Sequence, residues 1–140
     1  MDLAAALQYA GTTTRGVLVT QKRDGRPQLS NIMYGLDDGL VRISLTADRA
    51  KTRNVARDPR VSLHVTAPDF WSYVVLEGDA ELSPEAGDSP DTLAELRDLY
   101  RSISGGEHDD WDDYDRAMAA DRRQVLRLRP THAYGMLPQG

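Results

Sequence analysis

The chain contains no cysteine, and this absence excludes several kinds of chemistry at once. Disulfide bonds, thiolate metal ligands and a cysteine nucleophile are all ruled out. The Gly-x-Ser-x-Gly turn of many hydrolases and the His-Glu-x-x-His pair of zinc proteases are also missing. A hydrolase would therefore lack its usual parts.

Long apolar runs and targeting signals are absent too. The N-terminus has neither a basic segment nor a long apolar core, and no later stretch reaches the length of a membrane span. No repetitive or low-complexity tract interrupts the 140 residues, a length typical of one domain. We therefore expect a cytoplasmic protein with a single domain over residues 1–140 and no membrane partner.

Basic residues are fewer than acidic ones, 17 against 22, so the formal net charge is −5. Most of such a surface would repel a phosphate backbone, and we expect no nucleic-acid partner. One stretch differs, because residues 48–60 contain five basic and two acidic side chains. A functional interpretation can be built on this basic stretch.

Residues 49–57 of the basic stretch are predicted to form a short helix, with Asp48 as its N-cap and Pro59 beyond its end. Arg49 and Lys51 then lie in the first turn, where cations are unfavourable unless an anion is bound. This pattern suits a phosphate. On these residues alone, a solvated basic helix face remains the alternative.

Alternating apolar residues predict six strands, which with their turn signals indicate an antiparallel barrel or sandwich. The predicted strands are residues 16–20, 27–34, 40–46, 61–66, 71–82, with a glycine bulge at Gly78, and 123–129. Besides the basic helix, helices are predicted between Leu3 and Gly11, at residues 91–103 and at residues 107–118. A small barrel is filled by its own side chains, so an extended ligand would lie outside it or between subunits.

Polar side chains beside the basic helix are candidates for a binding site. The strand 40–46 turns Ser44 and Thr46 to the face opposite its apolar residues, directly before the helix. His64 lies on the polar face of its own strand, where a lone histidine is more often a surface or packed residue than a ligand. No neighbouring residues complete a metal set, and no metal site is expected.

Two further groups have structural interpretations. Trp71 and Tyr73 alternate onto one face at the start of a strand, which favours a core or an oligomer interface over a ligand wall. The acidic run at residues 107–115 opens a helix, where carboxylates complement the positive end of the helix dipole. It has no defined ligand pattern for a divalent cation.

Five segments resemble the flavin and deazaflavin oxidoreductases of the split β-barrel fold, a pyridoxamine-phosphate-oxidase-like superfamily. They are residues 25–31, 49–54 with 58–60, 71–73 with 77–78, 111–114 and 132–135. Their order and spacing are most similar to the actinobacterial branch that uses coenzyme F420. The resemblance implies an α+β split barrel, mainly β with helical excursions and six or more largely antiparallel strands. It also implies a homodimer with the cofactor groove at its interface.

The resemblance implies roles for individual residues as well. The implied cofactor-binding residues are Gln28, Leu29, Ser30, Asn31, Ser44, Thr46, Arg49, Lys51, Asn54, Trp71 and Tyr73, with Arg53 in support. The phosphate would lie on Arg49 and Lys51, and the tricyclic ring along residues 28–31. Trp71 and Tyr73 would come from the second subunit.

The implied activity is hydride transfer from reduced F420 to a small conjugated acceptor that contains a C=C, imine or quinone-like group. The cofactor would supply the chemistry, while the protein supplies binding and orientation. Tyr73 and His132 are the candidates for a proton donor. Two alternatives stay open: an FMN-dependent oxidase or reductase of the same fold, and a protein that binds a flavin, haem or tetrapyrrole without turnover.

Overall fold

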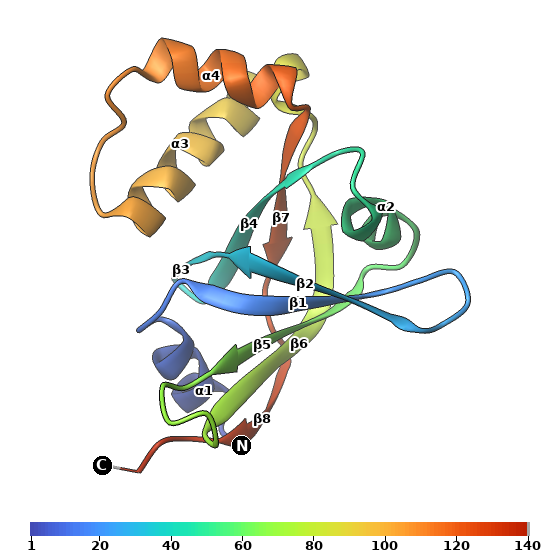
Figure 1. Cartoon of the computed structure of the whole chain (residues 1–140), viewed down its shortest axis with the longest axis vertical. Coiled ribbons are helices and arrows are strands. Elements are labelled where there is room, and N and C mark those ends of the chain that lie inside the picture. The colour runs from blue at the N-terminus through green and yellow to red at the C-terminus, as the bar shows by residue number, and fades with distance from the viewer. Residues whose placement is uncertain (140) are drawn as a thin grey trace.

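The computed structural model describes residues 1–139 and shows a curled antiparallel sheet with four α-helices packed around it (Figure 1). The elements are α1 (Leu3–Ala10), β1 (Arg15–Gln21), β2 (Pro27–Met33), β3 (Gly35–Asp37), β4 (Leu40–Thr46), α2 (Ala50–Arg57), β5 (Arg60–Thr66), β6 (Tyr73–Leu82), a 3-10 turn (Ala86–Asp88), α3 (Pro90–Ser104), α4 (Trp111–Ala120), β7 (Arg123–Leu128) and β8 (His132–Met136). The six predicted strands and the predicted helices are all present. The short strands β3 and β8 are additional. Within these residues, no helix has both the length and the apolar character needed to cross a membrane.

The sheet is an open barrel in which every pairing is antiparallel. The strand order is β2-β1-β5-β6-β7-β4-β3, and β8 also pairs with β6. The long strand β6 has two different neighbours along one edge, because its first part pairs with β8 and its last residues pair with β7. β2 pairs only with β1, so its other edge faces β4 without ladder hydrogen bonds. This opening makes the fold an α+β split barrel, as predicted.

The glycine bulge predicted at Gly78 is wrong, because β6 pairs with β5 in unbroken register through that residue. Gly78 lies instead where the chain crosses from β7 to β8. A Cβ atom at this position would lie 3.1 Å from the carbonyl oxygen of Arg129, and this close approach favours glycine. β6 also begins at Tyr73, so Trp71 lies in the preceding turn rather than in the predicted strand.

Two apolar clusters hold the fold together. The barrel interior contains the predicted inward residues Val41, Ile43 and Leu45, each no more than 1% exposed. A second cluster lies beneath the helix pair α3 and α4, where Leu96 packs on Val125 of β7. The helix pair therefore covers one end of the barrel, over β4 and β7 (Figure 1).

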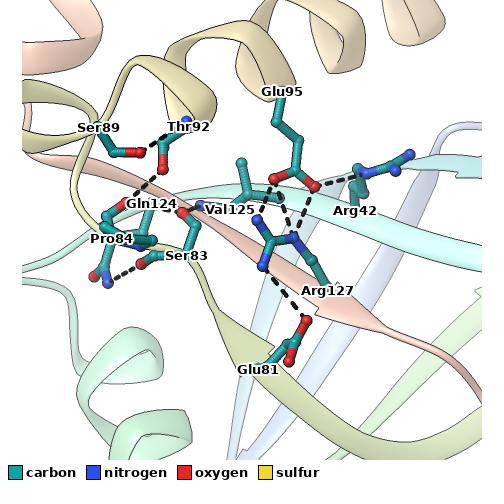
Figure 2. Close-up of polar contacts among 10 residues, drawn as sticks. All are labelled: Arg42, Glu81, Ser83, Pro84, Ser89, Thr92, Glu95, Gln124, Val125 and Arg127. Atoms are coloured by element: carbon teal, nitrogen blue, oxygen red, sulfur yellow. Dashed lines mark hydrogen bonds and ion pairs between the residues drawn. The ribbon is translucent and has the colours of Figure 1, made fainter.

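Charged contacts fix α3 on these strands, as Figure 2 shows. The Glu95 carboxylate on α3 accepts hydrogen bonds from Nε of Arg42 on β4 and Nε of Arg127 on β7, both at 2.8 Å. At the helix start, Ser89 Oγ accepts a hydrogen bond from the backbone N–H of Thr92. The Glu95 side chain is only 15% exposed, so these contacts are largely removed from water.

Candidate cofactor-binding site

A groove of about 400 Å³ lies at the opening of the barrel, between the free edge of β2 and the strands β4 and β7. We call it the split groove. Its lining residues are Asn31, Ile32, Met33, Ser44, Lys51, Leu99, Tyr100, Ile103, Ser104, Tyr114, Met118 and Arg123. The helices α3 and α4 give it a wall of large, mostly apolar side chains, while Ser44, Lys51 and Arg123 give it a polar and cationic end. Its volume suits a small molecule.

The start of α2 lies at the cationic end of the split groove. The prediction that Asp48 caps this helix is wrong, because Arg49 occupies the N-cap position and no side chain caps the helix. Thr52 Oγ1 donates a hydrogen bond of 2.7 Å to the carbonyl oxygen of Thr46, which ties the helix start to the end of β4. The first turn has no acidic residue. A helix start of this kind favours a bound anion.

Three cations, Arg49, Lys51 and Arg123, gather at this end of the groove. Among the described residues, Arg49 and Lys51 form no ion pair, and Arg123 reaches the Asp121 carboxylate only at 3.6 Å. Burial lowers the pKa of Lys51, and the positive charges of Arg49 and Arg123 lower it further. The fold therefore holds repelling cations together at this point.

Two buried polar atoms at the same end, Thr46 Oγ1 and Arg123 Nε, have no hydrogen-bond partner within residues 1–139. The Thr46 hydroxyl lies near enough to Asp48 to lower the pKa of that carboxyl group, but outside good hydrogen-bonding geometry. Arg123 Nη1 reaches the Ser44 hydroxyl only at 3.5 Å. Buried donors without partners are costly unless a ligand satisfies them. A phosphate oxygen is an acceptor that fits these groups.

The strand segment 28–31, predicted to lie along a planar ring, forms part of the free edge of the sheet. Because β2 pairs only with β1, backbone N–H and C=O groups on its other side are open to a ligand. Among the four predicted side chains, Asn31 lines the split groove. Leu29 is 59% exposed, while Gln28 and Ser30 are half-buried.

The structure does not bring Asn54 to this groove. Its side chain is 7% exposed, and its Nδ2 donates a 3.1 Å hydrogen bond to Thr20 Oγ1 on β1. Its Oδ1 accepts a hydrogen bond from Arg57. In this structure Asn54 anchors α2 on the barrel.

Trp71, Tyr73 and His132 lie away from the split groove of their own chain. Trp71 is 77% exposed, and the Tyr73 ring stacks on His64 with centroids 5.3 Å apart. His132 Nε2 lies 3.9 Å from Glu77 Oε1. Tyr73 pairs with Met136 of β8, and His132 is four residues before Met136 on the same strand. Four strand residues span roughly 13 Å, so the two proton-donor candidates are not neighbours.

Several groove residues were missed by the sequence reasoning. Arg123 lies opposite Thr46 in the register of β7 and β4, a long-range pairing that no local pattern reveals. Tyr114 donates a 2.9 Å hydrogen bond to the Leu96 carbonyl oxygen, and burial raises the pKa of its hydroxyl to about 12. Tyr114 is therefore a neutral part of the wall.

Two further grooves adjoin these elements. The first, which we call the outer groove, is lined by β1, β2 and β5 and has a volume of about 470 Å³. His64, which was expected to be a surface or packed residue, is among its lining residues. The second, the hairpin groove, lies between the β1–β2 turn and α2 and measures about 490 Å³. It is lined by Lys22, Arg23, Asp24, Ala50, Arg53, Asn54 and Arg57. Four of these side chains are basic and one is acidic.

No metal-ligand set is found in residues 1–139, since no three His, Asp or Glu side chains there come close enough to share an ion. The chemistry of the split groove is instead that of an anion and a planar group: cations, open backbone donors and a largely apolar wall.

A family model described as Pyridoxamine 5'-phosphate oxidase matches residues 4–137 of the chain. A conserved hypothetical protein of Mycobacterium tuberculosis has the same fold, with 24% identity, a TM-score of 0.78 and coverage of 100% of this chain and 91% of that one. A structure named F420 Reductase is 27% identical over 86% of this chain and 89% of that one, with a TM-score of 0.66. A heme binding protein of Mycobacterium smegmatis is 25% identical with a TM-score of 0.75, and the match covers all of this chain but 56% of that one.

Proposed function

Because the chain belongs to the pyridoxamine 5'-phosphate oxidase family, we propose that it is a reductase that uses coenzyme F420 to reduce a small conjugated acceptor. The observation that carries this proposal is the gathering of Arg49, Lys51 and Arg123 at the open edge of the barrel, where only Arg123 has an ion-pair partner within residues 1–139, Asp121 at 3.6 Å. When bound, the reduced deazaflavin supplies a hydride to a C=C, imine or quinone-like group of the acceptor. The protein binds the cofactor and orients it.

The phosphate of the cofactor is held at the start of α2. Lys51 and Arg49 provide charge, Arg123 provides the buried Nε donor, and Ser44 and Thr46 provide hydroxyl groups. Charge-assisted hydrogen bonds of this kind are among the strongest that a protein makes. The open backbone groups of residues 28–31, at the free edge of β2, would hold the polar rim of the ring.

The hairpin groove favours F420 over FMN. FMN ends at its phosphate, whereas F420 continues beyond it into a chain of glutamates. Lys22, Arg23 and Arg53 line the hairpin groove and form no ion pair within residues 1–139, so they are available to carboxylates near the same helix. The relative named F420 Reductase supports the same choice.

A homodimer completes the site in this proposal. The outer face of the sheet formed by β2, β1, β5, β6 and β8 exposes large apolar side chains that a monomer would leave in water. They include Leu29, Met33, Tyr134 and Met136, each between 45% and 63% exposed. Trp71, in the turn before β6, is 77% exposed. A second copy on this face would cover them and would bring its own Trp71 and Tyr73 to the cofactor.

Cofactor titration tests the proposal. The purified protein is titrated with oxidised F420 and, separately, with FMN, and binding is followed by fluorescence quenching. We expect F420 to bind at least tenfold more tightly than FMN and reduced F420 to be oxidised when conjugated acceptors are added. Preference for FMN would support the flavin-dependent alternative. Tight F420 binding without turnover on any of a broad panel of acceptors would support a carrier.

A further inference from the structure

The outer groove carries chemistry that the cofactor does not use. It meets the split groove at β2, because Asn31, Ile32 and Met33 line both. A ring along residues 28–31 would therefore meet the outer groove at Asn31. At about 470 Å³, the outer groove lies within the range of small-molecule sites.

The polar side chains of the outer groove are those of Arg15, Asn31, His64 and Thr66, and each can donate a hydrogen bond. The exposed Arg15 guanidinium forms no ion pair or hydrogen bond within residues 1–139. The His64 ring is positioned on both sides: its Nδ1 lies 3.3 Å from Thr66 Oγ1, and its face stacks on Tyr73 at an interplanar angle of 23°. Nε2 of His64 has no hydrogen-bond partner within residues 1–139, and both His64 and Asn31 line the groove.

The remaining surface of the groove is apolar. Val17 lies between Asn31 and His64 in the cross-strand register, so a flat aliphatic patch separates two polar groups. Met33 is paired with Arg15 and adds a flexible apolar side chain next to the guanidinium. No carboxylate is among the lining residues. The site is shaped for a flat apolar body that carries an acceptor group with negative charge.

We propose that the outer groove binds the acceptor substrate, and that this substrate is a planar conjugated carboxylic acid whose carboxylate is held by Arg15 with support from Asn31 and His64. A guanidinium binds a carboxylate through two parallel hydrogen bonds, which fixes its orientation as well as its position. The assignment rests on the proposed function, because the grooves adjoin only through the strand that carries the cofactor ring. In the proposed homodimer, the second copy forms the opposite wall of the outer groove.

A binding experiment on the full chain tests this assignment without turnover. The probe is cinnamate, a planar acid with a conjugated double bond, and its uncharged match is cinnamamide. Dissociation constants are measured by calorimetry in the presence and absence of oxidised F420. We expect cinnamate to bind at least fivefold more tightly than cinnamamide.

Substitutions of single residues test whether cinnamate binds in the outer groove. Arg15→Met is expected to weaken cinnamate binding about tenfold and to leave cinnamamide binding within twofold, because only the acid uses the guanidinium. Arg15→Lys keeps the charge and should retain part of the affinity, and it replaces Arg15→Met if the latter does not fold. His64→Gln should weaken cinnamate about threefold. Arg26→Met, at the exposed β1–β2 turn, is the matched control and should change nothing.

The outcomes separate this assignment from the proposed function. If wild-type protein binds cinnamate no better than cinnamamide, or if Arg15→Met binds it as tightly as wild type, the assignment is overturned even when F420 binds well. If F420 does not bind but the cinnamate affinity still depends on Arg15, the cofactor proposal fails and the acid-binding groove stands.

Discussion

One face of the paired strands β4 and β7 carries cations at both ends, and the two ends differ in how closely the fold brings the opposite charge to them. At one end Arg42 and Arg127 lie directly opposite each other and share the Glu95 carboxylate of α3 (Figure 2). At the other end Arg123 lies opposite Thr46, near Lys51, and its one ion-pair partner, the Asp121 carboxylate, stands farther away, at 3.6 Å.

This difference indicates which cations stabilise the fold and which are available to a ligand. Paired cations on these strands stabilise the fold, because Glu95 draws α3 onto the barrel. At the other end, repulsion between Arg123 and the cations Arg49 and Lys51 at the start of α2 destabilises the ligand-free protein slightly. We therefore explain these cations at an open groove by ligand binding.

The largest effect is expected from Glu95→Ala. It leaves two arginines without their common acceptor and releases the contact between α3 and the sheet. We expect the free energy of unfolding to fall by about 2–3 kcal/mol, measured by urea denaturation followed by circular dichroism. Glu107→Ala removes an exposed partner of Arg101 and is the control, with an expected change below about 0.5 kcal/mol. If both substitutions lowered the free energy of unfolding equally, Glu95 would contribute no more to stability than an exposed ion pair does.

The next largest effect is expected from a substitution of Arg123, at the other end of β4 and β7. Arg123→Met should weaken cofactor binding by about 2 kcal/mol, or roughly thirtyfold, because a buried charge-assisted donor is lost. The unfolding free energy of the cofactor-free protein should change by less than about 0.5 kcal/mol. Fluorescence titration and denaturation of the same sample measure both quantities. Arg116→Met, an exposed arginine on α4, should leave both unchanged; a loss of stability in Arg123→Met without a loss of affinity would assign Arg123 to the fold.

A smaller effect is expected from pH. Hydrogen bonds from Arg127, and then from Arg42, lower the pKa of Glu95 below its ordinary value. A carboxyl group with a lowered folded-state pKa stabilises the protein above its unfolded-state pKa of about 4.3, and this contribution is lost as the pH falls through the folded-state value. Urea denaturation at pH 7, 5, 4 and 3 should therefore show wild type and Glu95→Gln converging below pH 4.3. A constant difference across this range would contradict the assignment.

The smallest effect is expected from Lys51→Met without cofactor. Removing one of three repelling cations should raise the unfolding free energy by about 0.5 kcal/mol or less, since water screens much of the repulsion. Thermal unfolding at low ionic strength is the measurement, and added salt should shrink the difference. A clear loss of stability would show that Lys51 has a structural partner.

The parts of the fold that could be predicted are those written in local patterns. Val41, Ile43 and Leu45 alternate along the chain, and this pattern places them in the core because a strand turns every second residue to one face. The helix of residues 49–57 and its basic first turn are also predicted from local sequence, although the N-cap is Arg49 rather than the predicted Asp48.

The parts that could not be predicted depend on which strands become neighbours. Arg123 reaches the split groove only because β7 pairs with β4 across nearly 80 residues of sequence. His64 lines the outer groove because β5 pairs with β1, and its ring is oriented by Tyr73 on β6. Asn54 shows the reverse case, since a residue beside the basic turn in sequence faces Thr20 in the structure.

The most direct test of the account is the dissociation constant of F420 for Lys51→Ala, measured by fluorescence titration beside wild type at the same salt concentration. Loss of the charge-assisted contact should weaken binding by about 1–3 kcal/mol, which corresponds to roughly 5- to 150-fold, while the ligand-free protein remains folded. A dissociation constant equal to that of wild type would contradict the assignment of Arg49, Lys51 and Arg123 to the cofactor phosphate.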